Sequence, residues 1–420
     1  MADVVSEPAS IPSRWHVAQI GAREHFGIPR GFHQLRTLGG LYTDMWSYGG
    51  GGLLKRGPAM ARAFAARRHP DIPSSLVHAH NIAALRRAFT SPKPRTRADE
   101  FHAFIKTGEW FSRAVAGDLG RRSLDSNRDR FFGYNTGCLE LIPSLRDRGV
   151  FTVVDQIDPA RTEEALVLEE MQRWPGWQSM PDTIPSVYFD RLSAEWDLAD
   201  MVVVNSDWSR RALIEQGVAA DKIVIVPLAV APAAVSANAV ARAKSEVVTV
   251  LWLGNVILRK GIQYLIGAAK LLQAQNIRFI VAGPVGISAD AVASAPPNVE
   301  FVGRVTRDRA QDYFAAADVF VLPTISDGFA LTQLEAMSHG LPVITTPNCG
   351  EVVREGIDGF IVPPRDSEQL ADRILRLARD RYLRVSMGRC ALERVTDFPI
   401  SRPAREIEAA ATRIRTQTYR

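Results

Sequence analysis

The chain has 420 residues, of which 46% are hydrophobic and 23% are charged, and its formal net charge is +5. This composition excludes a largely disordered chain, and the length suits two domains. The three cysteines, Cys138, Cys349 and Cys390, show neither a metal-ligand spacing nor a disulfide framework, which favours a reducing compartment. A signal-peptide pattern and an apolar run of roughly 20 residues are both missing, so we expect a cytoplasmic protein.

The first half of the chain alternates strand-like and helix-like segments, which indicates a parallel α/β sheet. The predicted strands lie at 16–22, 40–44, 76–80, 151–155, 201–206 and 222–227. The predicted helices lie at 23–38, 58–68, 98–119 and 208–216. The helix at 98–119 is expected to bury one apolar face, formed by Phe101, Phe104, Ile105, Phe111 and Val115. The four glycines at 49–52 predict a loop, and the alanine-rich stretch 228–245 predicts a linker.

Basic residues concentrate between Leu53 and Arg97, where ten Lys or Arg are opposed by one acid, Asp71. Solvated helix faces, an anionic membrane surface and a phosphate-bearing acceptor all fit such a patch. The membrane reading predicts a peripheral protein on the inner face of the membrane. A nucleic acid partner is not expected, because no helix-turn-helix, zinc-finger or RNP-like pattern is present.

The second half begins a new alternation of strands and helices. Its predicted strands lie at 247–253, 278–282, 299–302, 319–322, 343–345 and 360–362. Its predicted helices lie at 261–273, 307–316, 330–339, 367–379 and 402–415. The fold class is therefore α/β, with two doubly wound, Rossmann-like domains at about 1–230 and 246–399.

The most specific pattern lies at 318–346, which reads as a buried strand, a polar loop, a helix and a second strand. The helix is expected to run from about Phe329 to His339, with the carboxylates Asp327 and Glu335 beside its first two turns. Free N–H groups at a helix N-terminus suit a phosphate or a sugar hydroxyl. A capping or turn role for Asp327 and a surface role for Glu335 are the structural alternatives.

This segment resembles the donor-site signature of retaining glycosyltransferases of family 4, the group 1 transferases: Glu-Gly-Phe-Gly-Leu-x-x-x-Glu-Ala-Met. The chain matches it at Gly328, Phe329, Leu331, Glu335, Ala336 and Met337, and has Asp327 at the first glutamate and Ala330 at the second glycine. The resemblance implies the GT-B fold, in which two domains face each other across a cleft. The second domain would bind the donor, the first would bind the acceptor, and a C-terminal helix at about 400–420 would return to the first domain.

The same resemblance implies roles for individual residues. Asp327 would accept hydrogen bonds from the donor hexose, and Glu335 would hold the ribose hydroxyls of the nucleotide. The backbone N–H groups of Gly328, Phe329, Ala330 and Leu331 would face the sugar and the phosphate.

A second signal lies in the loop after the strand 247–253. In the resembling family this loop reads Gly-Arg-x-x-x-x-Lys-Gly, and its two cations bind the donor diphosphate. This chain has Gly254, Asn255 at the usual arginine, and Arg259 directly before Lys260. Arginine suits phosphate by its fork and lysine as a point charge, so Arg259 and Lys260 are expected to stabilise the leaving group. A solvated loop is the alternative reading of Arg259 and Lys260. Arg304, at another strand end, is expected to border the base of the nucleotide.

The acceptor side is less specific. Five polar residues lie at apparent strand ends of the first domain: Arg23, His25, His78, His80 and Asp155. Packed or surface histidines are the structural alternative for His78 and His80.

The function that the resemblance implies is retaining transfer of a hexose from a UDP- or GDP-linked sugar to a glycan or lipid-linked acceptor, in cell-envelope or exopolysaccharide biosynthesis. The departing phosphate would help to deprotonate the acceptor, so no protein nucleophile is needed. The sequence contains no Gly-x-Ser-x-Gly elbow, HExxH or Asp-x-Asp motif, and we expect neither a metal nor another cofactor. A catalytically silent GT-B protein that binds nucleotide sugars or scaffolds partners, and a GT-B epimerase or phosphorylase, remain alternatives.

Overall fold

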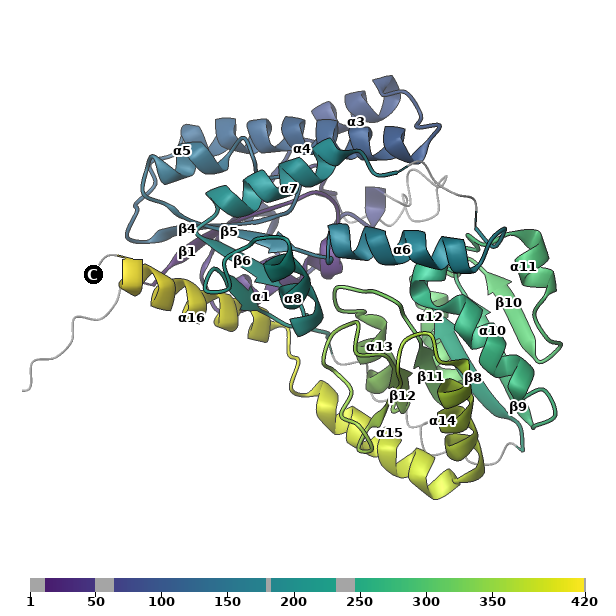
Figure 1. Ribbon diagram of the computed structural model, residues 1–420. Coiled ribbons are helices and arrows are strands. Elements are labelled where there is room, and N and C mark those ends of the chain that lie inside the picture. Colours follow the sequence, from purple (N-terminus) through teal and green to yellow (C-terminus); the bar gives the residue numbers. More distant parts are fainter. Residues whose placement is uncertain (1–11, 50–63, 179–182, 232–245, 419–420) are drawn as a thin grey trace, which may run out of the picture.

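The computed structural model describes residues 12–49, 64–178, 183–231 and 246–418. They form two parallel sheets, one of seven strands in the order β3-β2-β1-β4-β5-β6-β7 and one of six in the order β10-β9-β8-β11-β12-β13. Figure 1 shows helices packed around each sheet, so both halves are Rossmann-like α/β domains. Within the part of the chain that is described, no helix is both long and apolar enough to span a bilayer.

The first sheet is built from buried apolar runs close to the predicted positions. Its strands are β1 (Arg14–Gln19), β2 (Leu38–Thr43), β3 (Val77–Ala79), β4 (Asp129–Tyr134), β5 (Phe151–Gln156), β6 (Met201–Val204) and β7 (Ile223–Ile225). The accompanying helices are η1 (Arg23–Phe26), α1 (Gly27–Gln34), η3 (Ser74–Leu76), α3 (Asn81–Thr90), α4 (Arg97–Gly120), α5 (Ile142–Arg146), α6 (Arg161–Arg173), α7 (Ser186–Leu198) and α8 (Asp207–Glu215).

The second sheet follows the same plan. Its strands are β8 (Val248–Leu253), β9 (Ile277–Ala282), β10 (Val299–Gly303), β11 (Val319–Leu322), β12 (Val343–Thr345) and β13 (Gly359–Ile361). Its helices are η5 (Leu258–Lys260), α10 (Ile262–Leu271), α11 (Ala289–Ala293), α12 (Arg307–Ala316), α13 (Thr332–Ser338), α14 (Ser367–Arg379) and α15 (Arg381–Val395).

The last helix, α16 (Ser401–Thr418), lies along the first domain, although the preceding helices belong to the second (Figure 1). Ala404, Ile407 and Ala411 form an apolar stripe at helical spacing that joins the core of the first sheet. A Cβ at Gly31 of α1 would lie 2.7 Å from the Ile400 carbonyl oxygen, so a glycine allows this close approach. The apolar stripe of α16 is thereby removed from water.

Two expectations for the first domain are wrong. The predicted helix at 23–38 is instead a 3₁₀ turn followed by the short α1, because Glu24, His25 and Phe26 all have positive φ values and interrupt the helix. Phe104 was expected on the buried face of α4 but is 55% exposed. The loop predicted at 49–52, the helix at 58–68 and the linker at 228–245 lie largely outside the described residues.

Candidate functional site

The two family-like segments of the second domain meet at the carboxyl ends of the adjacent strands β8 and β11. Lys260, at the end of η5, places its ammonium on a carboxylate oxygen of Asp327, in the loop that follows β11. Both side chains are largely shielded, with 16% and 13% of their surfaces exposed. Burial, and then the neighbouring Arg259, lowers the pKa of Lys260 to about 7, and the carboxylate of Glu163 opposes that shift. The contact therefore holds a cation and an anion together where the donor was predicted.

Backbone geometry makes this meeting possible. Gly261 has a φ of +75°, and a Cβ there would lie 1.8 Å from the Pro323 carbonyl oxygen, so only glycine lets η5 approach the loop after β11. Asp327 accepts a hydrogen bond from the N–H of Ala330 at 3.2 Å, and Ala330 itself has a φ of +64°. The loop therefore extends further than the sequence suggested.

This extension corrects the predicted start of the helix. It begins at Thr332, three residues after Phe329, because the left-handed Ala330 interrupts regular helical geometry. The ring of Phe329 is buried and packs edge-on against Phe398. Its side chain therefore belongs to the core, and only its backbone can contribute to the surface of the loop. Leu331 forms the N-cap of the helix.

Arg259 turns away from Lys260 toward the first domain. Its guanidinium donates to a carboxylate oxygen of Glu163 in α6 and to the Ser326 carbonyl, both at 3.1 Å. The Ser326 hydroxyl donates to the same Glu163 oxygen at 3.0 Å. Burial raises the pKa of Glu163, and Arg259 opposes that shift. The sequence did not single out Glu163, because a glutamate in a polar helix usually indicates a solvated face.

Glu335 lies on α13 in a half-buried position. Burial raises its pKa, and Arg307, at the start of α12, is the charge that opposes the shift. Arg307 also acts on His25 of the first domain, where burial comes first and this cation second in lowering the pKa of His25 to about 4. Arg307 is thus electrostatically coupled to groups in both domains, and nothing in its local sequence indicated this.

The remaining predicted donor residues are more peripheral. Asn255 and Arg304 are exposed at the ends of β8 and β10. Gly254 packs by its carbonyl oxygen against Gly283, where a Cβ would lie at 1.7 Å.

The first domain collects acidic groups at the carboxyl ends of β1, β4 and β5. Asp155 is fully buried, and burial, then the nearby Glu24, raises its pKa well above the usual range. Burial also raises the pKa of Glu24 to about 7. The Tyr134 hydroxyl donates to Glu24 at 3.4 Å, and the Arg23 guanidinium lies 5.3 Å from the centre of the Tyr134 ring. The charge of Glu24 therefore adds to burial in disfavouring the ionised form of Asp155.

His78 and His80 lie elsewhere, on the edge strand β3 and just after it, separated from β4 by β2 and β1. His78 stacks on Tyr42 with the ring centres 4.9 Å apart, and the Nε2 atom of His80 lies 3.3 Å from a carboxylate oxygen of Asp118. The structure therefore brings Arg23 near Asp155, whereas His25 is influenced by Arg307, His69 and Arg30, and these two histidines lie apart.

The two domains contact each other along α6, and we call this contact the α6 interface. Glu170 of α6 is fully buried and accepts hydrogen bonds from Arg365 at 2.5 Å, Tyr264 at 2.7 Å and Gln263 at 2.8 Å, all in the second domain. One buried carboxylate thus joins three groups of the opposite domain.

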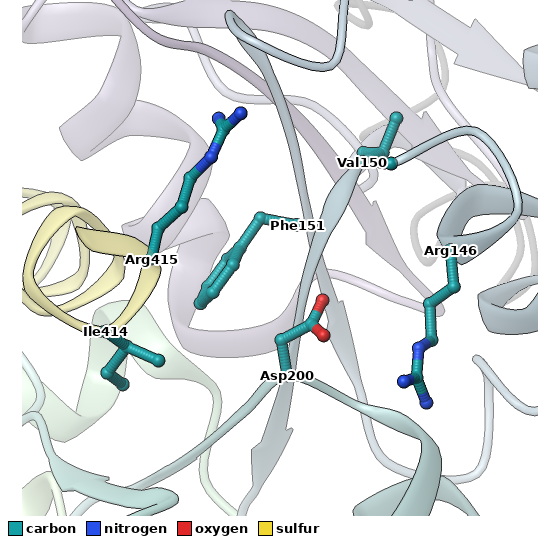
Figure 2. A pocket seen from close by; sticks show the side chains of 7 residues that line it. Arg146, Val150, Phe151, Asp200, Ile414 and Arg415 are labelled. Carbon is teal, nitrogen blue, oxygen red and sulfur yellow. The ribbon is translucent and has the colours of Figure 1, made fainter. Parts of the chain in front are cut away.

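A separate hollow of about 260 Å³ lies beside α16 at the amino end of β5 (Figure 2). Arg146 and Asp200 line it, and both are used within the fold: Arg146 donates to the Leu198 carbonyl at 2.9 Å, and Asp200 accepts from the Thr152 N–H at 2.7 Å. Because ligands of parallel sheets bind outside the carboxyl ends of the strands, this hollow is not part of the candidate site.

Across 12–49, 64–178, 183–231 and 246–418, no group of three or more His, Cys, Asp or Glu is arranged to hold an ion.

Comparison with known proteins finds a family similar to the second domain. Residues 247–380 match the family model described as "Glycosyl transferases group 1". Sulfoquinovosyl transferase SQD2 of Arabidopsis thaliana is 30% identical over 175 residues, which are 40% of this chain and 33% of the relative. The capsular polysaccharide biosynthesis glycosyltransferase CapM of Staphylococcus aureus is 30% identical over 154 residues, 34% of this chain and 40% of the relative. The amylovoran biosynthesis glycosyltransferase AmsK of Erwinia amylovora is 25% identical over 206 residues, 46% of this chain and 50% of the relative. The matches thus span a third to a half of these relatives.

Solved structures resemble the whole chain. Sucrose-phosphate synthase from Thermosynechococcus elongatus superposes with a TM-score of 0.61 at 20% identity, covering 97% of this chain and 98% of the other. HepE of Anabaena, in complex with UDP, superposes with a TM-score of 0.61 at 15% identity, covering 95% and 99%. At such low identity the likeness shows the fold alone, and it confirms the predicted GT-B arrangement of two Rossmann-like domains.

Proposed function

Because residues 247–380 form a group 1 glycosyl transferase domain within a GT-B fold, we propose that the protein is a retaining, nucleotide-sugar-dependent hexosyltransferase of family 4. The observation that carries the proposal is the contact between Lys260 and Asp327, which joins the two family-like segments at one sheet edge. A UDP- or GDP-linked sugar is the donor, and no metal or other cofactor takes part.

In this proposal the donor diphosphate replaces two carboxylates as the partner of the site's cations. Lys260 and Arg259 each contact a carboxylate, Asp327 and Glu163 respectively, and the donor diphosphate takes the place of those carboxylates. Asp327 is then released to accept hydrogen bonds from the hexose, while Glu335 holds the ribose. Cations beside the diphosphate stabilise the charge that develops as it departs, which lowers the barrier.

The acceptor approaches from the first domain, beside Arg23, His25 and Asp155. The charge of Arg307 acts on groups of both domains, because it opposes the rise in the pKa of Glu335 and contributes to the lowering of the pKa of His25. Similarity to transferases named for capsular polysaccharide and amylovoran biosynthesis supports a polysaccharide, glycolipid or similar acceptor in envelope or exopolysaccharide assembly.

We propose further that the protein is cytoplasmic and docks on the inner face of an anionic membrane through α3. Ile82 and Phe89 are seven residues apart on one helical face and are 86% and 71% exposed, and Arg86 lies between them. Lys93 and Arg95 follow directly. Exposed apolar side chains with adjacent cations suit a lipid interface, where each nearby cation contributes about 1 kcal/mol.

Vesicle flotation tests the membrane proposal. Ile82→Ser with Phe89→Ser should abolish binding to vesicles containing phosphatidylserine. Tyr382→Ser, at a 90% exposed position of the second domain, should leave it intact. Equal flotation of the wild type with neutral and anionic vesicles would contradict the proposal.

The donor reaction is tested by melting the protein with UDP, GDP, ADP and their sugars, followed by mass spectrometry of each stabilising pair. A donor at a hundred times its dissociation constant should stabilise the fold by about 2.7 kcal/mol. If no nucleotide moves the melting curve, the transferase proposal is wrong. The protein could instead bind a nucleotide sugar and release no free nucleotide with any acceptor in a panel of glycans and lipids. That result would favour a catalytically silent nucleotide-sugar-binding protein.

A further inference from the structure

A cavity of about 270 Å³ lies between the two domains, beside the α6 interface. Its walls come from α4, α6 and α7 of the first domain and from the stretch that leads into η5 of the second. Its volume lies just below the roughly 300 Å³ at which pockets for drug-sized ligands begin, so it suits a single ring. The site described above does not include this cavity.

One wall of the cavity is aromatic. Phe101 and Tyr188 meet edge to face with their ring centres 4.7 Å apart, and Tyr188 and Phe189 do so at 5.5 Å. Such mutual packing fixes the orientation of the rings. A rigid aromatic wall offers an apolar surface to the C–H face of a sugar ring.

The rest of the lining is polar, and most of its charge is already compensated. Arg97 pairs with both oxygens of Glu164 at 2.6 and 2.9 Å, and Arg259 pairs with Glu163 at 3.1 Å. The further carboxylate in the lining is Asp158, which accepts hydrogen bonds from the N–H of Ala160 and the amide of Gln156 through the same oxygen, Oδ1. The lining thus has a slight negative balance, which disfavours an anionic ligand.

Tyr188 and Asp158 lie near each other in this lining. Burial, and then the charge of Asp158, raises the pKa of Tyr188, so its phenol stays protonated. A hydroxyl-rich ring could therefore receive a hydrogen bond from Tyr188 and donate one to Asp158.

The cavity also adjoins the proposed donor loop. Arg259 lines it, and a Cβ on Gly328 would lie 1.9 Å from the carbonyl oxygen of Ile157, next to Asp158. A ring bound here would lie next to the residues proposed to hold the donor.

We propose that this cavity binds an uncharged sugar ring of the acceptor, stacked on Tyr188 and held by Asp158. The proposal rests on the glycosyltransferase function proposed above and narrows it, since it selects a neutral saccharide over a phosphate-bearing group. Tyr188 and Asp158 act as specificity-determining residues.

Saturation-transfer NMR with methyl α-D-glucopyranoside and methyl α-D-mannopyranoside tests this binding, with glucose 6-phosphate as the anionic probe. At least one neutral glycoside should bind the wild type, more tightly than glucose 6-phosphate does. Tyr188→Ala should weaken that binding by about tenfold, the equivalent of one aromatic contact. Tyr382→Ala, at an exposed site of the second domain, should not change it.

Asp158→Asn keeps the shape of the side chain and provides a second test if Tyr188→Ala proves poorly folded; it should also weaken glycoside binding. The proposal is overturned if neither glycoside binds the wild type, or if the folded variants bind as the wild type does. UDP-dependent melting is followed in parallel, because it reports on the donor site alone. If UDP, GDP and ADP all leave the melting curve unchanged while a glycoside still binds, the transferase proposal is refuted, and the cavity stands as a neutral-saccharide site without an acceptor role.

Discussion

Replacing Glu170 by alanine should weaken the contact between the domains more than any change on the outer face of α6. The carboxylate is fully buried and accepts hydrogen bonds from Arg365, Tyr264 and Gln263 of the second domain. Its removal leaves buried donors without their acceptor, at a cost of about 1–3 kcal/mol each. Gln263 keeps a second hydrogen bond, to the Leu258 carbonyl at 3.0 Å, which moderates the loss.

We therefore expect the free energy of unfolding to fall by about 3 kcal/mol, at the lower end of the range for breaking a buried charged pair. For a cooperative unit of 150–250 residues this corresponds to a fall in Tm of about 6 to 12 °C. Differential scanning calorimetry measures it, and it should also separate the unfolding of the two domains into distinct transitions. Glu170→Gln, which keeps one acceptor oxygen, should fall between the alanine variant and the wild type.

Glu169 supplies the matched control on the same helix. It also pairs with Arg365, at 2.5 Å, but its side chain is 42% exposed and solvent screens the pair. Glu169→Ala should therefore shift Tm much less than Glu170→Ala. Equal shifts for the two alanine variants, or a shift below about 2 °C for Glu170→Ala, would refute the inference that the buried Glu170 contributes more to the α6 interface than the exposed Glu169.

Two further outcomes are expected. Lys260→Ala should lower kcat for donor turnover by about 10²–10³-fold, because a charge beside the leaving group is lost; an unchanged kcat would remove Lys260 from the mechanism. Lowering the pH should destabilise the fold through His25, whose pKa of about 4 in the folded chain lies below the unfolded value of about 6.5. The unfolded chain then binds more protons, so stability is lost as the pH falls from about 6.5 toward about 4. Urea unfolding at pH 7, 5 and 4 measures this, and His25→Gln should flatten the dependence; parallel slopes in both proteins would contradict it.

Much of the fold was predictable from local sequence alone. Buried strands of parallel sheets are short apolar runs bounded by polar residues, and the strands near 151–156, 201–204 and 248–253 were all visible for that reason. The segment around Asp327 and Glu335 was recognisable because its spacing and residue types are specific. The family model that matches residues 247–380 supports the group 1 interpretation of the second domain, whereas the individual roles of the site residues stay predictions.

Tertiary structure decided which charged groups meet. Nothing in the sequence pairs Lys260 with Asp327, because their contact depends on β8 and β11 being neighbours in the sheet. Likewise, Arg259 looked like a partner of Lys260 but instead contacts Glu163, a residue 96 positions away that comes from the other domain.

Local patterns also failed where the backbone departs from regular geometry. The left-handed residues Glu24, His25 and Phe26 delayed the start of one predicted helix, and Ala330 delayed the start of another. Apolar periodicity reports which side of an element faces a core, so the sequence determined the strands and most of the helices of this protein. Long-range charge pairing, the effect of Glu24 on the pKa of Asp155, and the cavity beside α6 all depend on distances through space. Only the packed domains set those distances.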